Sequence, residues 1–204
     1  LTAAPKRVIE KYLTVVKGAG LKAIALEPES AALTRALTKP NDPATIIVSL
    51  GGTSTELIIA SGGNSLFSRS IATGGSTLTR AVMAEFNLPQ AQAEQYKQSY
   101  GILEDKLSGK VAVVLKPVLD ILATEILKAV EFAQGHVSVN QIARVQITGG
   151  GAFLPGLPEF LVNRTSLEVS LGDSWDDFKK EGLITTMVGQ GSLYSVATGL
   201  AIWS

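Results

Sequence analysis

The chain lacks cysteine and has a single histidine among its 204 residues. Without cysteine it has no disulfides, no thiolate metal sites and no cysteine nucleophile, and this composition is compatible with a reducing compartment. One histidine argues against a His-based metal cluster and against a Ser-His-Asp triad. That residue, His136, lies beside Gly135 after a long apolar helical pattern, so we expect it at a helix end.

An excess of charge of either sign is also missing. Lys+Arg and Asp+Glu both count 18, which gives a formal net charge of zero. Nucleic-acid-binding proteins usually carry a basic excess, so we expect no nucleic-acid partner.

Long apolar runs are absent as well. Residues 46–60 and 111–133 are the most apolar stretches, and polar residues or Gly interrupt both before the ~20 residues that a membrane helix needs. We therefore expect no direct membrane insertion, and no signal peptide is visible. The chain begins with Leu1 rather than Met, which we interpret as an excised piece or a processed product.

What is present is a large apolar fraction, 46% of the residues, enough for a sizeable core. Residues 1–38 have the pattern of strand, helix, strand and helix, with a helix over 6–19 and a short strand over 21–26. Residues 39–43 form a Pro- and Asp-containing turn cluster and are the best candidate for a boundary.

The remaining residues predict an alternation of strands and helices. We expect strands over 45–50, 56–60, 65–71, 142–148 and 167–171. Helices are expected over 76–86, 89–100, 111–133 with an interruption at Pro117, 155–162 and 191–203, with a loop over 173–186.

Two apolar strands lead into Gly-Gly turns, at residues 46–55 and 145–154. Glycine lets backbone N–H groups approach an anion closely, and neighbouring Ser or Thr hydroxyls add donors, so the combination suits a phosphate. Each turn alone also fits an ordinary tight connection in a sheet. Neither matches the two common phosphate-loop fingerprints.

Glu94 and Lys97 lie three residues apart, on one face of a predicted helix. One interpretation is an exposed ion pair that contributes a few tenths of a kcal/mol. The other is a carboxylate and an ammonium group that reach a ribose, in which case both contribute to affinity and not to the stability of the fold.

In this order, the elements resemble the second half of the actin, chaperone and sugar-kinase fold. Residues 48–55 resemble its second phosphate loop, and residues 147–157 its adenosine loop. Gly74-Gly75-x-x-Leu78-Thr79, followed by Ala93-Glu94-x-x-Lys97, resembles its ribose-contacting helical subdomain. Residues 26–32 are similar to the Glu-Pro-x-Ala-Ala segment of bacterial actins.

Within this superfamily the chain most resembles the type IV pilus assembly family PilM, a relative of the division protein FtsA. The resemblance covers nearly the whole chain. It is carried by residues 2–6 with 18–21, the Ala-Glu-x-x-Lys helix, residues 122–132 and residues 197–201.

The resemblance implies an α/β fold of the ribonuclease-H-like actin type, with mixed sheets covered by helices and an incomplete first domain. Residues 1–38 would end that first domain, and residues 44–190 would form the second, with 76–109 as its helical subdomain. Residues 191–204 would return as a helix that packs on the first domain.

The resemblance also implies a site for ATP and Mg²⁺ in the full-length protein, with no metal ligand from these residues. Glu27 would position the attacking water. The nucleotide would be bound by Gly51, Gly52, Thr53, Ser54, Gly75, Glu94, Lys97, Gly149, Gly150, Gly151 and Phe153. The sequence departs from the family pattern at Ser49, where an Asp usually organises the metal, and it lacks the upstream phosphate loop.

The expected function is that of a cytoplasmic scaffold of pilus assembly. It would be peripheral to the inner membrane through its partners, bind ATP in its full-length form and dock the N-terminal peptide of an inner-membrane pilus protein. We expect at most weak ATPase activity in the full-length protein and none in this fragment. An active actin-like ATPase or small-molecule kinase is one alternative, and a nucleotide-free structural relative like the secretion protein GspL is another.

Overall fold

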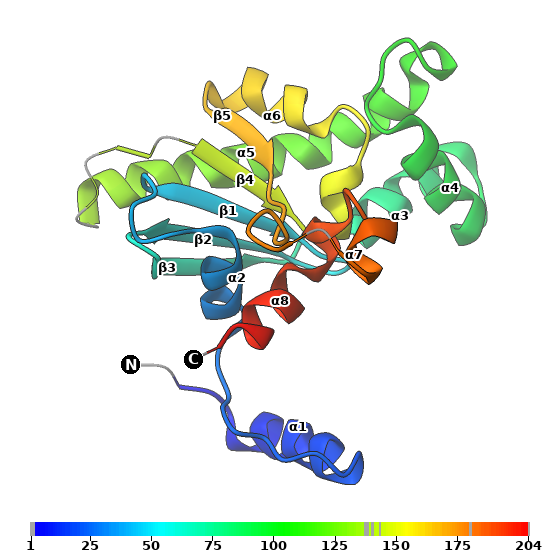
Figure 1. The fold of residues 1–204 in the computed structure, drawn as a ribbon. Coiled ribbons are helices and arrows are strands. Elements are labelled where there is room, and N and C mark those ends of the chain that lie inside the picture. The colour runs from blue at the N-terminus through cyan, green and yellow to red at the C-terminus, as the bar shows by residue number, and fades with distance from the viewer. Residues whose placement is uncertain (1–2, 137–138, 140, 143, 180, 204) are drawn as a thin grey trace.

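The computed structural model describes residues 3–136, 139, 141–142, 144–179 and 181–203. A five-stranded sheet in the order β3-β2-β1-β4-β5 forms its centre (Figure 1). The first three strands pair antiparallel, and β1–β4 and β4–β5 pair parallel, so the sheet is mixed, as predicted. The strands are β1 (Thr45–Leu50), β2 (Thr55–Ser61), β3 (Asn64–Ile71), β4 (Arg144–Thr148) and β5 (Glu168–Leu171).

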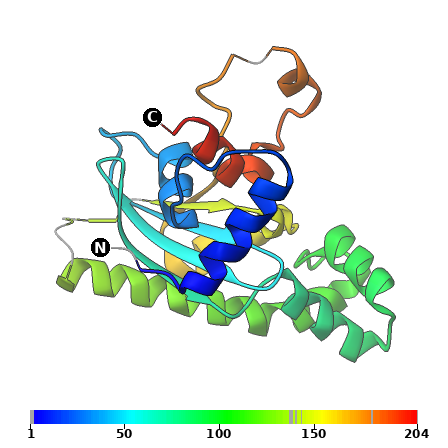
Figure 2. The ribbon, with the colours of Figure 1, turned by 90° about the horizontal axis from the view of Figure 1, so that it is seen from below.

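Helices cover both faces of this sheet, which confirms the α/β class (Figures 1 and 2). In the described residues, no helix is long and apolar enough to cross a membrane. The helices are α1 (Lys6–Gly18), α2 (Glu29–Leu37), α3 (Gly75–Phe86), α4 (Gln90–Tyr100), α5 (Lys110–His136), α6 (Leu157–Thr165), α7 (Leu183–Thr186) and α8 (Ser195–Ala201), with 3₁₀ turns η1 (Leu107–Gly109), η2 (Gly150–Phe153) and η3 (Gly191–Tyr194).

The central strand β1 is apolar at nearly every position because both of its faces are covered. Ile46 and Val48 belong to the large core beneath α5 and α6. Ile47 faces the other way, into a smaller core that Leu33 and Leu37 of α2 complete. A strand between two layers cannot alternate apolar and polar residues, and this explains the continuous apolar run in the sequence.

Helix α5 runs through Pro117 without the predicted interruption. A proline inside a helix removes one N–H, which leaves the carbonyl four residues earlier without its partner. That residue is Val113, whose side chain is 71% exposed. Because this side of the helix faces solvent, water can satisfy the carbonyl and the helix continues.

The start of the chain differs from the prediction. The helix α1 forms as expected, but none of its residues is buried, and it lies apart from the sheet on the side of α2 (Figure 1). Residues 21–26 form no strand: no described strand pairs with them, and Leu21, Ile24 and Leu26 are exposed. A strand requires a neighbour for its N–H and C=O groups, and apolar character alone does not provide one. The strand expected before α1 lies partly outside the described residues, and residues 3–5 are not strand.

The end of the chain also differs from the prediction, because it contains short helical segments in place of one loop and one longer helix. The loop over 173–186 contains the short helix α7, and the single helix over 191–203 divides into η3 and α8. Helix α8 packs on α2 so closely that a Cβ added at Gly199 would lie 1.9 Å from the Ala32 carbonyl oxygen. The assignment of residues 1–38 to the end of a first domain, on which residues 191–204 pack, stays a prediction.

Candidate functional site

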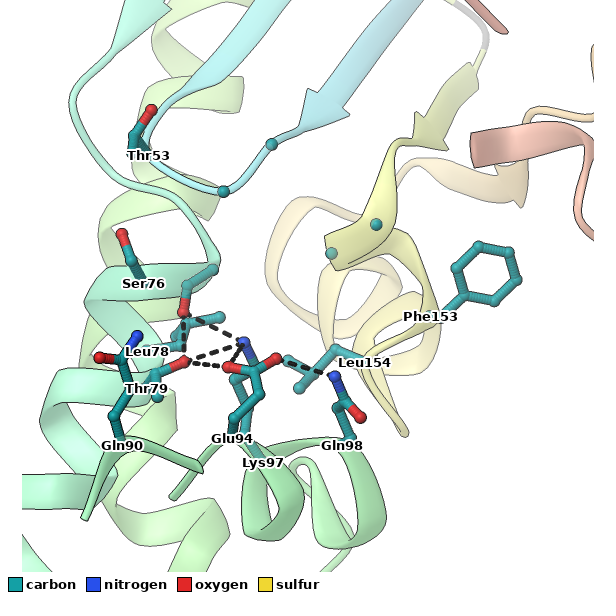
Figure 3. Close-up of a pocket in the computed structure, with 15 residues that line it drawn as sticks. Thr53, Ser76, Leu78, Thr79, Gln90, Glu94, Lys97, Gln98, Phe153 and Leu154 are labelled. Atoms are coloured by element: carbon teal, nitrogen blue, oxygen red, sulfur yellow. Dashed lines mark hydrogen bonds and ion pairs between the residues drawn. The ribbon is translucent and has the colours of Figure 1, made fainter. Parts of the chain in front are cut away.

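The two Gly-rich turns lie at the same edge of the sheet. The strands β1 and β4 are adjacent and parallel, with Ser49 in register with Thr148, so the turns that follow them, residues 51–54 and 149–151, come side by side. Together with α3 and α4 they surround a cleft of about 600 Å³ (Figure 3). Ligands of α/β proteins bind preferentially outside the carboxyl ends of such strands.

Most of the residues predicted to bind a ligand line this cleft. They are Gly51, Gly52, Thr53, Gly75, Glu94, Lys97, Gly150, Gly151 and Phe153. Ser54 and Gly149 adjoin the lining within the same two turns. The lining also includes residues that the prediction did not name as binding residues: Ser76, Leu78, Thr79, Gln90, Gln98 and Leu154. Helical spacing could have identified Gln90 and Gln98, since each lies four residues from Glu94.

The first turn is held by its own backbone and by the start of α3. The Gly51 N–H donates to Ser54 O at 3.0 Å, and the Gly75 N–H donates to Gly51 O at 2.9 Å. The backbone is so close at Gly74 that an added Cβ would lie 2.7 Å from Ser54 N. Glycine is therefore required at Gly74 to bring the turn against the helix.

The second turn contains one glycine without a packing role. Gly149 has a φ of 81°, and a Cβ there would lie 2.7 Å from Leu50 O. At Gly151 a Cβ would lie 2.2 Å from the side chain of Leu50. At Gly150, by contrast, the nearest described atom would be Leu193 Cδ2, at 3.9 Å. The fold thus requires Gly149 and Gly151, while Gly150 leaves space in the cleft.

Both turns contribute residues to the lining of the cleft whose backbone N–H groups are free to donate. Within the described residues, the backbone N–H groups of Gly52, Thr53, Gly150 and Gly151 donate to no protein acceptor. Converging, unpaired N–H groups attract anions, and phosphate oxygens are suitable acceptors. The arrangement can therefore bind phosphate groups without a positively charged side chain.

A hydrogen-bonded network forms the floor of the cleft on the side of α3 and α4. Lys97 Nζ donates to Glu94 Oε2 at 2.8 Å, to Thr79 Oγ1 at 3.0 Å and to Gly75 O at 3.2 Å. Thr79 Oγ1 lies 2.5 Å from the same Glu94 oxygen, and Gln98 donates to Glu94 Oε1 at 2.9 Å. Figure 3 shows these side chains converging, with the Phe153 ring directed away from them.

The interpretation of Glu94 and Lys97 as an exposed ion pair is wrong, because the Lys97 side chain is only 11% exposed. Burial alone raises the pKa of the Glu94 carboxyl, but the hydrogen bonds from Lys97 and Thr79 and the Lys97 charge outweigh it. The pKa therefore lies below its ordinary value, and Glu94 is ionised at neutral pH. Since Lys97 also binds the Gly75 carbonyl, the pair contributes to the fold as well as to the cleft.

Glu27 is not among the residues that line the cleft. Its carboxylate forms a bidentate ion pair with Arg35. The hydrogen bond from Arg35 is the largest cause that lowers the Glu27 pKa, and the Arg35 charge adds to it against a smaller effect of burial. The catalytic role of Glu27 stays a prediction.

Ser49, at the end of β1, is 8% exposed and lies directly across from Glu56 of β2. Burial raises the pKa of the Glu56 carboxyl, and the charge of Glu29 raises it further, against hydrogen bonds from Ser70 and Ser68. Among the described residues, no three His, Asp or Glu side chains converge as a metal site.

A family model described as Type IV pilus assembly protein PilM matches residues 1–204. The chain is 27% identical over 145 residues to the ethanolamine utilization protein EutJ of Salmonella typhimurium. This aligned segment covers 71% of this chain and 46% of that protein. It thus spans about half the length of the curated relative that it matches.

Solved structures of the actin-like fold are similar over almost the whole chain. A PilM-PilN type IV pilus biogenesis complex has a TM-score of 0.78 at 24% identity, over 98% of this chain and 58% of that one. EutJ of Carboxydothermus hydrogenoformans has a TM-score of 0.73 at 22% identity, and the match covers 99% of this chain and 63% of that one. MreB 5 of Spiroplasma citri bound to AMPPNP has a TM-score of 0.70 at 19% identity, and the match covers 98% of this chain and 65% of that one. These likenesses confirm the predicted actin-type fold.

Proposed function

Because this chain belongs to the family of the type IV pilus assembly protein PilM, we propose that the intact protein is a scaffold of pilus assembly that binds an adenine nucleotide. The observation that supports this most directly is the convergence of unpaired N–H groups from two turns on one cleft, opposite an ionised carboxylate. Phosphates require the first feature, and a ribose hydroxyl can donate to the second.

The residues that would hold the nucleotide follow from their positions. The N–H groups of Gly52, Thr53 and Gly150 would bind phosphate oxygens, and Glu94 would accept from the ribose. The base would lie along residues 151–153. The same fold in MreB 5 of Spiroplasma citri binds AMPPNP in one structure and ADP in another. A Mg²⁺ ion would neutralise phosphate charge when bound, and phosphates and water would hold it, since Ser49 offers no carboxylate.

We assign this protein a binding role rather than efficient turnover of ATP. An efficient hydrolase positions a water molecule next to a free base and organises its metal with a carboxylate. Here Glu27 is paired with Arg35, and the penultimate residue of β1 is Ser49, which has no carboxylate.

The proposed partner is the N-terminal peptide of an inner-membrane pilus protein. Support comes from the similarity to a PilM-PilN complex of type IV pilus biogenesis. Membership of the PilM family also supports a place on the cytoplasmic side of the inner membrane, reached through this partner.

A second candidate function is an active ATPase or small-molecule kinase of the same fold, and the observation that favours it is Glu27, which precedes α2 as in bacterial actins. A nucleotide-free relative like GspL is the third. The presence of Glu94, Lys97 and the triple-glycine turn at residues 149–151 argues against it.

Calorimetric titration of the intact protein with Mg-ATP tests the proposal. Gly150→Val should abolish binding, because the side chain would occupy the cleft, and a Cβ at this position has Leu193 Cδ2 as its nearest described atom, at 3.9 Å. Gly135→Ala is the matched control: no described atom lies within 4 Å of a Cβ at that position on α5, so affinity should not change. Equal affinity of wild type and Gly150→Val would show that the site assignment is wrong.

A further inference from the structure

Helix α5 and strand β3 form one continuous surface at the edge of the sheet opposite β5. β3 is the last strand at this edge (Figure 1), and no described strand pairs with its outer side. Two contacts join the strand to the helix. The rings of Phe67 and Phe132 have centroids 4.6 Å apart, and Arg69 Nη1 lies 2.8 Å from Glu125 Oε2. Residue numbers therefore rise along β3 as they fall along α5, so the two elements run antiparallel.

The helix contributes one stripe of side chains to this surface. Glu125 and Phe132 contact β3, and Ile121 and Lys128 lie on the same helical face, since the four residues are spaced by four, three and four positions. We call these four residues the α5 stripe. Ile121 is 53% exposed and Phe132 37%. Between them lies the ion pair of Lys128 Nζ with Glu125 Oε1, at 2.8 Å. The stripe thus has an apolar side chain at each end and opposite charges in its middle.

The order of residue types along the α5 stripe is self-complementary. The pair of Glu125 and Lys128 and the pair of Ile121 and Phe132 share the same midpoint in the sequence. If a second copy of α5 lies antiparallel about this midpoint, each Glu125 faces the other Lys128 and each Ile121 faces the other Phe132. Every contact then occurs twice, as a two-fold interface between identical chains requires. A parallel arrangement would instead oppose like charges, so the pattern favours the antiparallel one.

Strand β3 leads to the same two-fold axis. On the helix the axis lies between Glu125 and Phe132, whose partners on β3 are Arg69 and Phe67. The axis therefore crosses the strand at Ser68. Antiparallel pairing about Ser68 places Arg69 opposite Phe67 of the second copy and opposes no like charges. Pairing about Arg69 would place two guanidinium groups directly opposite each other, which is destabilising.

We propose that this surface is the interface of a symmetric homodimer, in which two β3 strands pair antiparallel about Ser68 and two α5 helices pack along their stripes. The axis is perpendicular to the sheet, so both helices lie on the same face of the joined sheet. Strands in a sheet are about 4.8 Å apart, which lets helices above two paired edges approach to the roughly 8–10 Å of packed helices. A bulge at Leu66 limits the length of the paired strands, and the stripes supply the rest of the interface. The proposal does not depend on the proposed nucleotide site.

Sedimentation velocity tests the association with the intact protein, which should be dimeric at tens of micromolar. Ile121→Glu places a carboxylate opposite Phe132, and Lys128→Glu opposes it to Glu125 of the second copy. Each should raise the dissociation constant of the dimer by roughly tenfold or more. Leu127→Glu is the matched control, because Leu127 is also exposed on α5 but lies outside the stripe; it should leave the dissociation constant unchanged. A monomeric wild type, or an equal effect of Ile121→Glu and Leu127→Glu, would overturn the proposal.

Crosslinking tests the axis itself, and it requires no weakening of the interface. The chain has no cysteine, so a single introduced cysteine reports one position. Ser68→Cys should form an intermolecular disulfide under mild oxidation, since directly opposite residues of an antiparallel pair have Cα atoms about 4.5–5.5 Å apart. Ser70→Cys is the matched control. Ser70 is an exposed serine on the same face of β3, but it would lie about 14 Å from its copy, too far for a disulfide. Equal crosslinking of the two variants, or crosslinking of neither, would show that the strands do not pair about Ser68 and would overturn the proposal.

Discussion

Arg35 binds both carboxylate oxygens of Glu27, with an Nη1–Oε1 distance of 2.8 Å and an Nη2–Oε2 distance of 2.6 Å. The same Nη1 donates to the Gly199 carbonyl at 2.7 Å. The pair therefore connects the segment before α2 with α8. It also lowers the pKa of Glu27, which makes this carboxylate a weak base.

The first prediction concerns hydrolysis. We expect the intact protein to hydrolyse bound ATP very slowly, and Glu27→Gln to change the rate by less than about twofold, because Arg35 already withdraws the carboxylate from proton transfer. Single-turnover assays with radiolabelled ATP would measure both rates. Brisk wild-type hydrolysis that Glu27→Gln abolishes would favour the ATPase alternative over the scaffold.

The second prediction concerns Ser49. Ser49→Asp should increase turnover in the intact protein, because it supplies the carboxylate that usually organises the metal. It should also destabilise the protein by ~1 kcal/mol, because the new charge lies directly across from Glu56. Adding Glu56→Gln should recover most of that loss, so the double variant is the better form for the rate measurement. Unchanged turnover in a stable, nucleotide-binding double variant would exclude this role for the position.

The third prediction concerns the contact of α8 with α2. Gly199→Ala should destabilise the protein by about 2 kcal/mol, because the added methyl group meets the Ala32 backbone and forces the helices apart. Gly135→Ala, in an open position on α5, should instead stabilise it by ~0.5 kcal/mol through helix propensity. Urea denaturation gives both values. If the two substitutions shift the midpoint of urea denaturation in the same direction, α8 does not pack on α2 as closely at Gly199 as described.

The fourth prediction concerns pH. Since the Glu56 pKa is raised in the folded state, folding is penalised once Glu56 ionises. The penalty is absent below pH ~4.5, grows as pH rises through the folded pKa and is complete above it. Glu56→Gln should therefore stabilise the protein by ~0.5 kcal/mol at pH 7 and have no effect near pH 4.

The contribution of Glu94 to stability should depend on pH in the opposite direction, so Glu94 serves as the comparison for Glu56. Its pKa is lowered, so its contribution to stability is present at neutral pH and is lost as pH falls through the folded value. Glu94→Gln should accordingly destabilise at pH 7 and lose this effect in acid. Denaturation curves at pH 7 and pH 4 give the stability change of each variant. If the stability changes of Glu56→Gln and Glu94→Gln have the same sign at pH 7, the assigned pKa shifts are wrong.

The sequence predicted the sheet and its helices well wherever local pattern and tertiary environment agree. The run of β1, the hairpin between β2 and β3 and the Gly-Gly turns all lie where expected. The apolar run at residues 21–26 was predicted wrongly because strand formation depends on a partner, which local sequence does not reveal. Pro117 was predicted to interrupt α5 because its exposure to solvent is not visible in the sequence.

The site shows the same limit. Residue types and spacing identified the two turns and the pair of Glu94 and Lys97 separately, and only the resemblance to the actin-type fold predicted them as one site. They could not predict that Lys97 is buried, because burial depends on the packing of α3 against α4. Thr79 was recognised within a motif but not as part of the site, since its role depends on the geometry of one hydroxyl group.

The pairing of β1 with β4 also determines when the cleft can form. Thr45 is in register with Arg144, so the two turns that face each other across the cleft are separated by about a hundred residues of chain. Contacts of such long sequence separation form slowly, because the chain must first lose the entropy of closing the intervening loop. A chain emerging from the ribosome has the first turn long before the second. Ligand binding would therefore report that folding of this sheet is complete, and a ligand present during refolding should stabilise the last step rather than initiate the first.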